Sequence, residues 1–366
     1  MSKFIPGLEL SDLFYKEIIQ PMLLDRFPGL EYSTARLDYG SDVLGFDTPM
    51  SMDHGWGPKL TLYLSETDFN HFHLILNEYF AYHLPFEFYG FPTHFAEPMS
   101  DGGVMTKKEN YPIHHGITIT TIEKFFFDYL GVNIHHSLTP AVWLTIPQQR
   151  LRTLRAGQIF YDDLGISILQ DQFHWYPHDL WLYLLASQWQ RINQAEPFVG
   201  RTGSVGDEIG ARLIASMLVQ NLMRLSFLME KKYTPYLKWF GSAFQQLNIA
   251  PELTPMFDAI INSIHWQQIE TNLSKAYQRA AEAHNALKIT PFIPADVSPF
   301  YNRPFLVPHA SRFVTALLAQ VRDPSVRALP PHLGNIDQIV DNTDLLESIP
   351  HCQLLANLYQ DPSSSK

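Results

Sequence analysis

The segment of this sequence with the clearest potential for chemistry runs from residue 37 to residue 58. It contains Gly40-Ser41 and, twelve residues after Ser41, Asp53. A Gly-Ser pair after a short strand can turn the chain tightly and present backbone N–H groups and a hydroxyl to a phosphate. A carboxylate about a dozen residues later, at the start of the next strand, could hold Mg²⁺ against the same phosphates. The pattern indicates phosphoryl or nucleotidyl transfer, where positioning and charge neutralisation supply most of the catalysis.

The same residues have an alternative explanation that involves no chemistry. Gly, Ser and Asp are common in surface β-turns, because they tolerate unusual backbone angles or hydrogen-bond to the backbone. A Gly-Ser pair alone therefore says nothing about function. The distance to Asp53 and the strands expected on both sides make the segment informative.

The N-terminal part is predicted to position this segment within an α/β layer. Alternation and β-branched residues predict strands, and apolar residues at helical spacing predict helices. Strands are expected at 32–37, 59–64 and 116–121, and helices at 11–26, at 67–82 and after the third strand as far as Gly131. Gly40-Ser41 would follow the first strand, and Asp53 would lie before the second.

The pattern becomes helical almost throughout from about Pro147 onward. Helices are expected at 177–194, 205–231, 236–247, 266–287 and 308–321, with breaks at 196–206 and 288–304. A chain of 366 residues suits two domains. We therefore expect an α+β protein, with an α/β domain containing a mixed sheet over residues 1–145 and a helical bundle domain over residues 146–366.

Composition limits the class of protein. Apolar residues make up 46% of the chain and charged residues 17%, which is enough for a sizeable core. The net charge of −11 argues against bulk binding of nucleic acid. The single cysteine, Cys352, suits a reducing compartment, and no run of 18 apolar residues predicts a membrane span. We expect a soluble, cytoplasmic protein with no membrane partner.

The segment resembles the DNA polymerase β-type nucleotidyltransferase superfamily, which includes aminoglycoside adenylyltransferases. The shared pattern is Gly-Ser, a gap of ten to twelve residues, then Ser-x-Asp-x-Asp. More closely, nearly the whole chain resembles an uncharacterised bacterial family of predicted nucleotidyltransferases. The matching stretches are 27–58, 173–213, 223–244, 281–291, 301–305 and 335–346.

This resemblance implies specific roles for residues of the segment. Gly40 and Ser41 would form the phosphate-side turn, and Asp53 would be the first metal-binding and catalytic carboxylate. The resemblance also implies a second carboxylate two residues further on, where this chain has Gly55. His54 would point away from the metal, because alternate residues of a strand face opposite sides.

Further carboxylates would have to come from elsewhere. The third one is expected from the strand at 116–121, which offers only threonines before Glu123. Asp42 and Asp47 are candidates to replace the carboxylate missing at Gly55. Loss of even one of three acidic ligands should remove most of the Mg²⁺ affinity, because carboxylate charge holds this cation.

The resemblance also implies that a helical domain closes one side of a nucleotide cleft and supplies cations to the triphosphate. Lys238, Arg224 and Arg201 are the candidates, since arginine offers a two-pronged contact to phosphate. Alternatively, Arg212 and Arg224 pair along one solvent-facing helix with acidic residues, namely Asp207, Glu208 or Glu230. The glycine-rich stretch 199–206 is either an anion-binding nest or a flexible loop between helices.

Three hypotheses follow from these observations. The first is Mg²⁺-dependent transfer of a nucleoside monophosphate from an NTP to a small-molecule or protein acceptor. The second is a degenerate transferase that binds a nucleotide or a partner without catalysis. The third is non-metal chemistry on the same fold, with His54 as a base.

Overall fold

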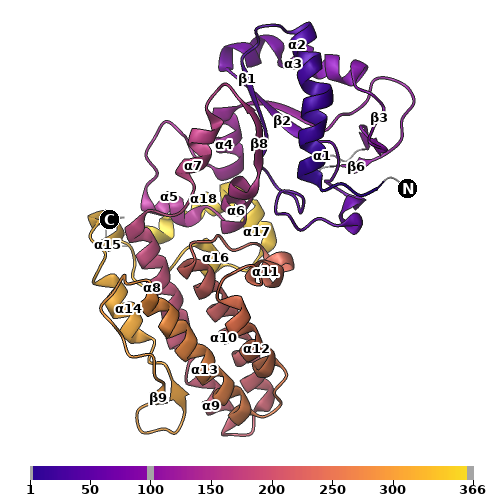
Figure 1. Cartoon of the computed structure of the whole chain (residues 1–366). Helices are drawn as coiled ribbons and strands as arrows, with labels where there is room; N and C mark the ends of the chain where they lie inside the picture. The colour runs from indigo at the N-terminus through magenta and orange to yellow at the C-terminus, as the bar shows by residue number, and fades with distance from the viewer. Residues whose placement is uncertain (1–2, 97–102, 361–366) are drawn as a thin grey trace. The chain divides into compact units, whose positions relative to one another are not determined.

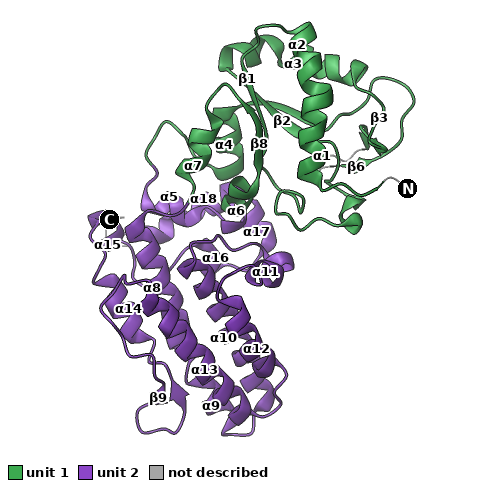
Figure 2. Ribbon diagram, viewed as in Figure 1, with its two compact units in different colours: residues 1–137, 150–174 green, residues 138–149, 175–366 purple. Residues whose placement is uncertain are grey.

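The computed structural model describes residues 3–96 and 103–360 (Figure 1). The chain forms two compact units, unit 1 (residues 1–137 and 150–174) and unit 2 (residues 138–149 and 175–366), which Figure 2 shows in different colours. We expected one boundary at 145/146, whereas the chain passes between the units three times. It returns to unit 1 because β8 (Gln158–Asp162) belongs to the sheet of that unit. The expected α+β class is confirmed.

A four-stranded mixed sheet forms the centre of unit 1. Its strands are β1 (Tyr32–Arg36), β2 (Leu60–Leu64), β7 (Ile117–Thr121) and β8, in the order β7-β2-β1-β8. β2 pairs parallel with β7, and β1 pairs antiparallel with both β2 and β8. Because β1 and β2 are central, every residue of both strands is buried.

Helices cover the sheet of unit 1. Leu60, Leu62 and Leu64 of β2 belong to an apolar core shared with the N-terminal helices and α3. Alternate residues face the other way, so Tyr63 packs edge-on against Phe125 of α4, with ring centroids 5.4 Å apart. The helical elements of unit 1 are α1 (Gly7–Phe14), the π-helical turn η1 (Tyr15–Ile19), α2 (Gln20–Arg26), η2 (Pro49–Asp53), α3 (Glu66–His83), α4 (Ile122–Leu130) and α7 (Ile166–Gln172).

Short hairpins and one helix complete this region. The two-residue strands are β3 (Glu87–Phe88) with β4 (Phe91–Pro92), and β5 (Phe95–Ala96) with β6 (Val104–Met105). α6 (Gln148–Ala156) contains the passage from unit 2 back to unit 1. α4 ends where expected, because Gly131 takes up the left-handed conformation (φ +72°) that closes a helix.

Unit 2 is helical, with α8 (His178–Ala195), α10 (Glu208–Met229) and α13 (Trp266–Ala286) as its long elements. α8 packs against α10 and α14, and α13 packs against α10 and α12. Trp181, Tyr183 and Trp189 of α8 are buried. The other elements are α5 (Pro140–Thr145), α9 (Phe198–Gly203), α11 (Leu237–Phe244), α12 (Ala250–Ile261), β9 (Ser298–Pro299), β10 (Leu306–Val307), α14 (Ser311–Leu318), α15 (Pro324–Arg327), α16 (Ile336–Ile339), α17 (Thr343–Glu347), α18 (Ile349–Leu354) and η4 (Leu355–Tyr359).

The glycine-rich stretch 199–206 contains the short helix α9, where we had expected a nest or a flexible loop. Its glycines permit close packing. A Cβ at Gly200 would lie 2.3 Å from the ring of Phe305, and one at Gly203 would lie 2.1 Å from the ring of Trp266. Gly200 and Gly203 are therefore required by close packing against these two rings.

No helix in the described part of the chain is long and apolar enough to cross a membrane.

Candidate functional site

The Gly40–Ser41 turn follows β1, as expected, after three intervening residues. Its backbone is closed by hydrogen bonds from the Leu44 N–H to the Gly40 carbonyl (3.2 Å) and from the Phe46 N–H to the Ser41 carbonyl (2.8 Å). Gly40 has φ +151°, and a Cβ there would lie 1.9 Å from Oδ1 of Asp42 and 3.2 Å from Nη2 of Arg36. This position therefore requires glycine.

Four charged side chains interact with one another at this end of β1. They are Arg36, Asp38, Asp42 and Lys59, and we call them the charge cluster. The Arg36 guanidinium forms ion pairs with Asp38 and with Asp42, the latter with an Nε–Oδ2 distance of 3.4 Å. It also donates to the Tyr39 carbonyl (3.1 Å). Arg36, Asp42 and Lys59 are buried, whereas the side chain of Asp38 is 23% exposed. The cluster thus reaches the surface at Asp38.

Burial and mutual attraction shift the pKa values of these groups. Burial raises the pKa of Asp42, and the nearby Arg36 offsets part of this effect. For Arg36, burial by itself lowers the pKa, but Asp38 and Asp42 reverse the shift and raise it. The pKa of Lys59 is lowered to about 8 by burial and by the charge of Arg36. Lys59 is therefore the cation of the cluster whose charge changes near neutral pH.

Arg36, Asp38 and Lys59 were missed by sequence reasoning. The available signal was a charged residue inside an otherwise uncharged β-rich run: Arg36 ends the predicted first strand, and Lys59 begins the predicted second one. Charged side chains are seldom buried unless they are paired. Their positions at the two strand ends could have indicated a shared cluster.

Asp53 and His54 lie away from the sheet. Asp53 is the last residue of η2, β2 begins only at Leu60, and the Asp53 side chain is 66% exposed. One of its oxygens lies 3.1 Å from Nδ1 of His54, and the other accepts the His54 N–H (3.0 Å). The pKa of Asp53 is lowered, because these contacts outweigh a slight effect of burial. The two residues therefore contact each other on an exposed turn.

Gly55 also lies outside a strand. Its φ is +68°, in the left-handed region, and its N–H donates to the Gly103 carbonyl (2.8 Å). The alternation that would put residues 53 and 55 on one face of a strand therefore does not apply here.

The two carboxylates considered as replacements both hold the fold together. Asp42 pairs with Arg36 in the charge cluster. Asp47 accepts hydrogen bonds from the Gly7 N–H (2.7 Å) and from Nε1 of Trp56 (2.9 Å). It thereby ties the start of α1 to a buried tryptophan. Moving Asp47 to a metal would leave the N–H of the buried Trp56 unpaired.

The strands supply no further carboxylate for a metal. β7 carries threonines, and Glu123 lies exposed in the first turn of α4. Asp162 of β8 lies opposite Ser33 of β1. It accepts hydrogen bonds from the Ser33 hydroxyl (2.8 Å) and from the N–H groups of Ile166 (2.8 Å) and Ser167 (3.0 Å) at the start of α7.

The residues present do not fit the metal pair that the resemblance implies. Within residues 3–96 and 103–360, no group of three or more His, Cys, Asp or Glu side chains is arranged to hold a metal ion. Among the described residues, Asp53 contacts His54, Asp42 forms an ion pair with Arg36, and Asp47 accepts two hydrogen bonds from the fold.

The three cations proposed for the triphosphate lie on different helices of unit 2. Arg201 is exposed on α9, with its guanidinium 5.8 Å from the Phe198 ring centre. Lys238 is exposed on α11, 5.1 Å from the ring of Trp239. Arg224, on α10, lies 5.5 Å from the ring of Phe240.

Arg224 does not pair with acids along its own helix. Burial lowers its pKa, while the carboxylate of Asp337 acts in the opposite direction. Asp337 itself accepts the Gln148 N–H (2.9 Å), and burial raises its pKa to about 6. Asp337, in the stretch 335–346, thus has a structural role in unit 2.

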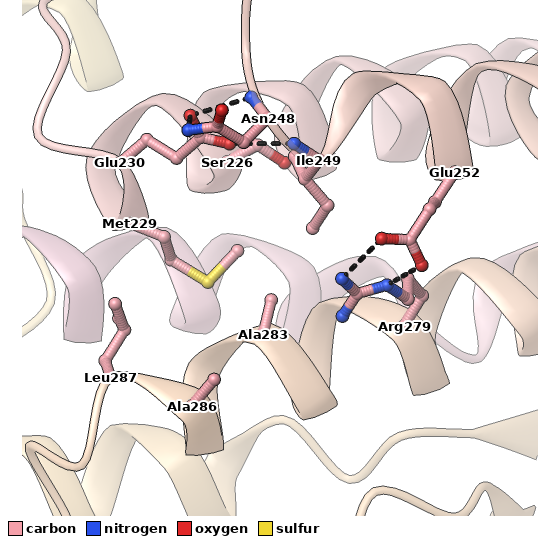
Figure 3. A pocket seen from close by; sticks show the side chains of 10 residues that line it. All are labelled: Ser226, Met229, Glu230, Asn248, Ile249, Glu252, Arg279, Ala283, Ala286 and Leu287. Atoms are coloured by element: carbon pink, nitrogen blue, oxygen red, sulfur yellow. Dashed lines mark hydrogen bonds and ion pairs between the residues drawn. The ribbon is translucent and has the colours of Figure 1, made fainter.

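A pocket of about 320 Å³ lies in unit 2, where α10, α12 and α13 approach one another (Figure 3). Its floor is apolar, with Met229, Ala283 and Leu287 among the lining residues. At its edge, Arg279 forms a two-pronged ion pair with Glu252 (2.5 and 2.8 Å). None of the site residues predicted from the sequence lines this pocket.

A family model described as a domain of unknown function, DUF4037, matches residues 143–240. The crystal structure of a nucleotidyltransferase-like protein from Exiguobacterium sibiricum 255-15 aligns with a TM-score of 0.31 and 9% identity, covering 85% of this chain and 89% of that one. No curated protein matches. The family match lies outside the Gly40–Ser41 turn and its charge cluster.

Proposed function

We propose that unit 1 binds the phosphates of a nucleotide at the Gly40–Ser41 turn, and that the chain acts through this binding and a protein or small-molecule partner, without metal-dependent transfer. One observation carries the choice: Asp42 and Asp47, the carboxylates that could replace the one missing at Gly55, are both held in structural contacts. The turn itself supports phosphate binding, because its backbone is tightly closed and the Arg36 guanidinium lies against Gly40.

Mg²⁺-dependent transfer of a nucleoside monophosphate is the second candidate, and the state of Asp53 favours it. This side chain is exposed and its pKa is lowered, so it is ionised at neutral pH. Magnesium in nucleotide sites is often held by one or two carboxylates together with substrate phosphates. Arg201, Arg224 and Lys238 would then be the cations that the resemblance assigns to the triphosphate.

Thermal unfolding with each NTP, with Mg²⁺ or with EDTA, separates the two candidates. A ligand that binds only the folded state raises its stability, by about 2.7 kcal/mol at 100 times Kd. We expect at least one NTP to raise Tm equally with and without Mg²⁺, and Asp53→Asn to leave this shift unchanged. Asp25→Asn, which changes an exposed carboxylate of α2, is the matched control.

The opposite outcomes are equally clear. A Tm shift that requires Mg²⁺, and that Asp53→Asn abolishes while Asp25→Asn preserves it, would establish the transfer candidate. No shift with any NTP would remove both candidates.

A further inference from the structure

The pocket between α10, α12 and α13 has an apolar floor and charged groups at its sides (Figure 3). Met229 and Ile249 are buried, and Ala283, Ala286 and Leu287 complete the apolar lining from the last turn of α13. The volume of about 320 Å³ is at the lower end of the range for small-molecule sites. The pocket therefore suits a small ligand with an apolar body.

The charged groups of the lining are two carboxylates and one guanidinium, which leave one negative charge. Arg279 and Glu252 neutralise each other, since the guanidinium donates from Nε and Nη2 to the two oxygens of Glu252 (2.5 and 2.8 Å). This pairing lowers the pKa of Glu252, so its carboxylate is ionised at neutral pH. The negative charge that remains belongs to Glu230.

Glu230 is held in place by uncharged groups. Its oxygens accept hydrogen bonds from the backbone and the side-chain amide of Asn248 and from the Ile249 N–H. No ion pair neutralises Glu230 within the part of the chain that the structure describes. An ionised carboxylate offers about four lone-pair sites, so three hydrogen bonds leave acceptor capacity unused. Glu230 can therefore accept a further donor from a ligand in the pocket.

We propose that this pocket binds a small organic cation, namely a protonated primary amine on an apolar body. The ammonium donates to Glu230, and the apolar body lies against Met229 and Ala283. An aromatic body fits best, because the thioether of methionine makes favourable contacts with aromatic rings. An anion would meet the charge of Glu230 and would have to displace Glu252 from its guanidinium partner. This site goes beyond the proposed function and does not depend on it, since every lining residue belongs to unit 2.

Three probes that share one apolar body test the charge requirement by isothermal titration of the full chain at pH 7.5. They are phenethylamine, phenethyl alcohol and phenylpropionate, of which the amine is a cation at this pH. We expect phenethylamine to bind about 10-fold more tightly than the alcohol, because a hydrogen bond between charged groups is stronger than a neutral one. Phenylpropionate should bind most weakly of the three.

Two variants locate the binding within the pocket. Glu230→Gln removes the charge, so the affinity for phenethylamine should fall by about 10-fold while that for the alcohol changes little. Glu282→Gln changes an exposed carboxylate of α13 outside the lining and is the matched control. Ala283→Leu places a larger side chain in the pocket and should abolish binding of both probes. Its control is Ala319→Leu, at the exposed end of α14, which should change neither affinity.

The comparison of probes on the wild type needs no substitution, so the proposal remains testable even if a variant does not fold. Phenethylamine that binds no better than the alcohol, or not at all at millimolar concentration, would overturn it. So would a folded Glu230→Gln or Ala283→Leu variant that binds phenethylamine as the wild type does, because the amine would then lie elsewhere on this acidic chain. None of these outcomes affects the proposed function, which is measured with nucleotides.

Discussion

The residue that determines the shape of the candidate site is Gly40. Its backbone has φ +151°, and its missing side chain leaves room for the Asp42 carboxylate and the Arg36 guanidinium. A Gly-Ser pair is a weak signal in sequence. In this fold it is the point where the chain leaves β1 and passes over buried charges that could not tolerate a larger residue.

We predict that Gly40→Ala destabilises unit 1 by about 2–4 kcal/mol, because the new Cβ meets Asp42 and the backbone becomes strained. Gly45→Ala is the matched control. Gly45 also has positive φ (+71°), but nothing lies within 4 Å of its Cβ position, so its cost should be about 1 kcal/mol. Urea unfolding followed by circular dichroism measures both changes. Equal losses would mean that the contact with Asp42 is unimportant.

At the level of elements, the ends of helices explain several polar residues to which sequence reasoning gave no role. Asp162 binds the N–H groups at the start of α7. Asn335 and Gln338 form a capping box around α16. Glu230, at the end of α10, reaches the start of α12 (Figure 3). A carboxylate is favoured at these places, because the first N–H groups of a helix have no partner within it.

Glu230→Gln should lower stability by about 1–2 kcal/mol. One carboxylate oxygen of Glu230 accepts hydrogen bonds from the backbone N–H (2.9 Å) and the side-chain amide (3.0 Å) of Asn248. The other oxygen accepts a hydrogen bond from the Ile249 N–H (2.9 Å). An amide turns one of these acceptors into a donor, which leaves a helix N–H unpaired. Glu282→Gln changes an exposed partner of Arg279 at 3.9 Å and should cost far less. Thermal unfolding of both variants provides the comparison, and similar Tm values would refute this role.

At the scale of the whole chain, buried ionisable groups of unit 2 should make stability depend on pH. Glu196 is buried and accepts the Ala310 N–H at the start of α14 (3.0 Å). Burial raises its pKa to about 7, although this hydrogen bond and Arg312 act in the opposite direction. The folded state therefore binds a proton that the unfolded state has already released between pH 4.5 and pH 7. Stability must fall as the pH rises through this range.

Glu196→Gln should remove this loss, which is about 3 kcal/mol at pH 8. The amide oxygen can still accept the Ala310 N–H, so the variant should be more stable than the wild type at pH 8 and similar at pH 5. Asp337, with a pKa raised to about 6, also lowers the stability as the pH rises, and the Glu196→Gln variant retains this second loss of stability. Thermal unfolding from pH 5 to pH 8 measures the effect. A variant less stable than the wild type at pH 8 would contradict it.

His284 makes the stability change with pH in the opposite direction to Glu196. Burial lowers its pKa to about 4, and its ring contacts Nε1 of Trp189 (3.3 Å) and the Thr290 hydroxyl (3.1 Å). Stability from this neutral histidine is present above its unfolded pKa and is lost as the pH falls from about 6.5 towards 4. The contributions of Glu196 and His284 to the pH dependence of stability oppose each other at acid pH. Since the Glu196→Gln variant retains His284, its difference from the wild type measures the contribution of Glu196 alone.

The sequence determined the α+β class, the three strands β1, β2 and β7, and most of the long helices. These elements carry strong local signals, namely period-two or helical spacing of apolar residues and Gly131 at the end of α4. Several elements were missed, and for two of them, α12 and β8, the reason is identifiable. α12 contains Pro251 at its start and Pro255 inside, which weakens a helical pattern. β8 lies among helices, and only its pairing with β1 makes it a strand.

Only the tertiary structure decided the composition of the candidate site. Sequence spacing brought Gly40-Ser41 and Asp53 together, but η2 and the left-handed Gly55 keep Asp53 on an exposed turn. The fold instead joins the end of β1 to the start of β2, because antiparallel neighbours bring these ends to one edge of the sheet. Arg36 and Lys59 meet there with two carboxylates. Local pattern cannot specify such a contact, since it depends on which strands pair and on which charges burial forces to find partners.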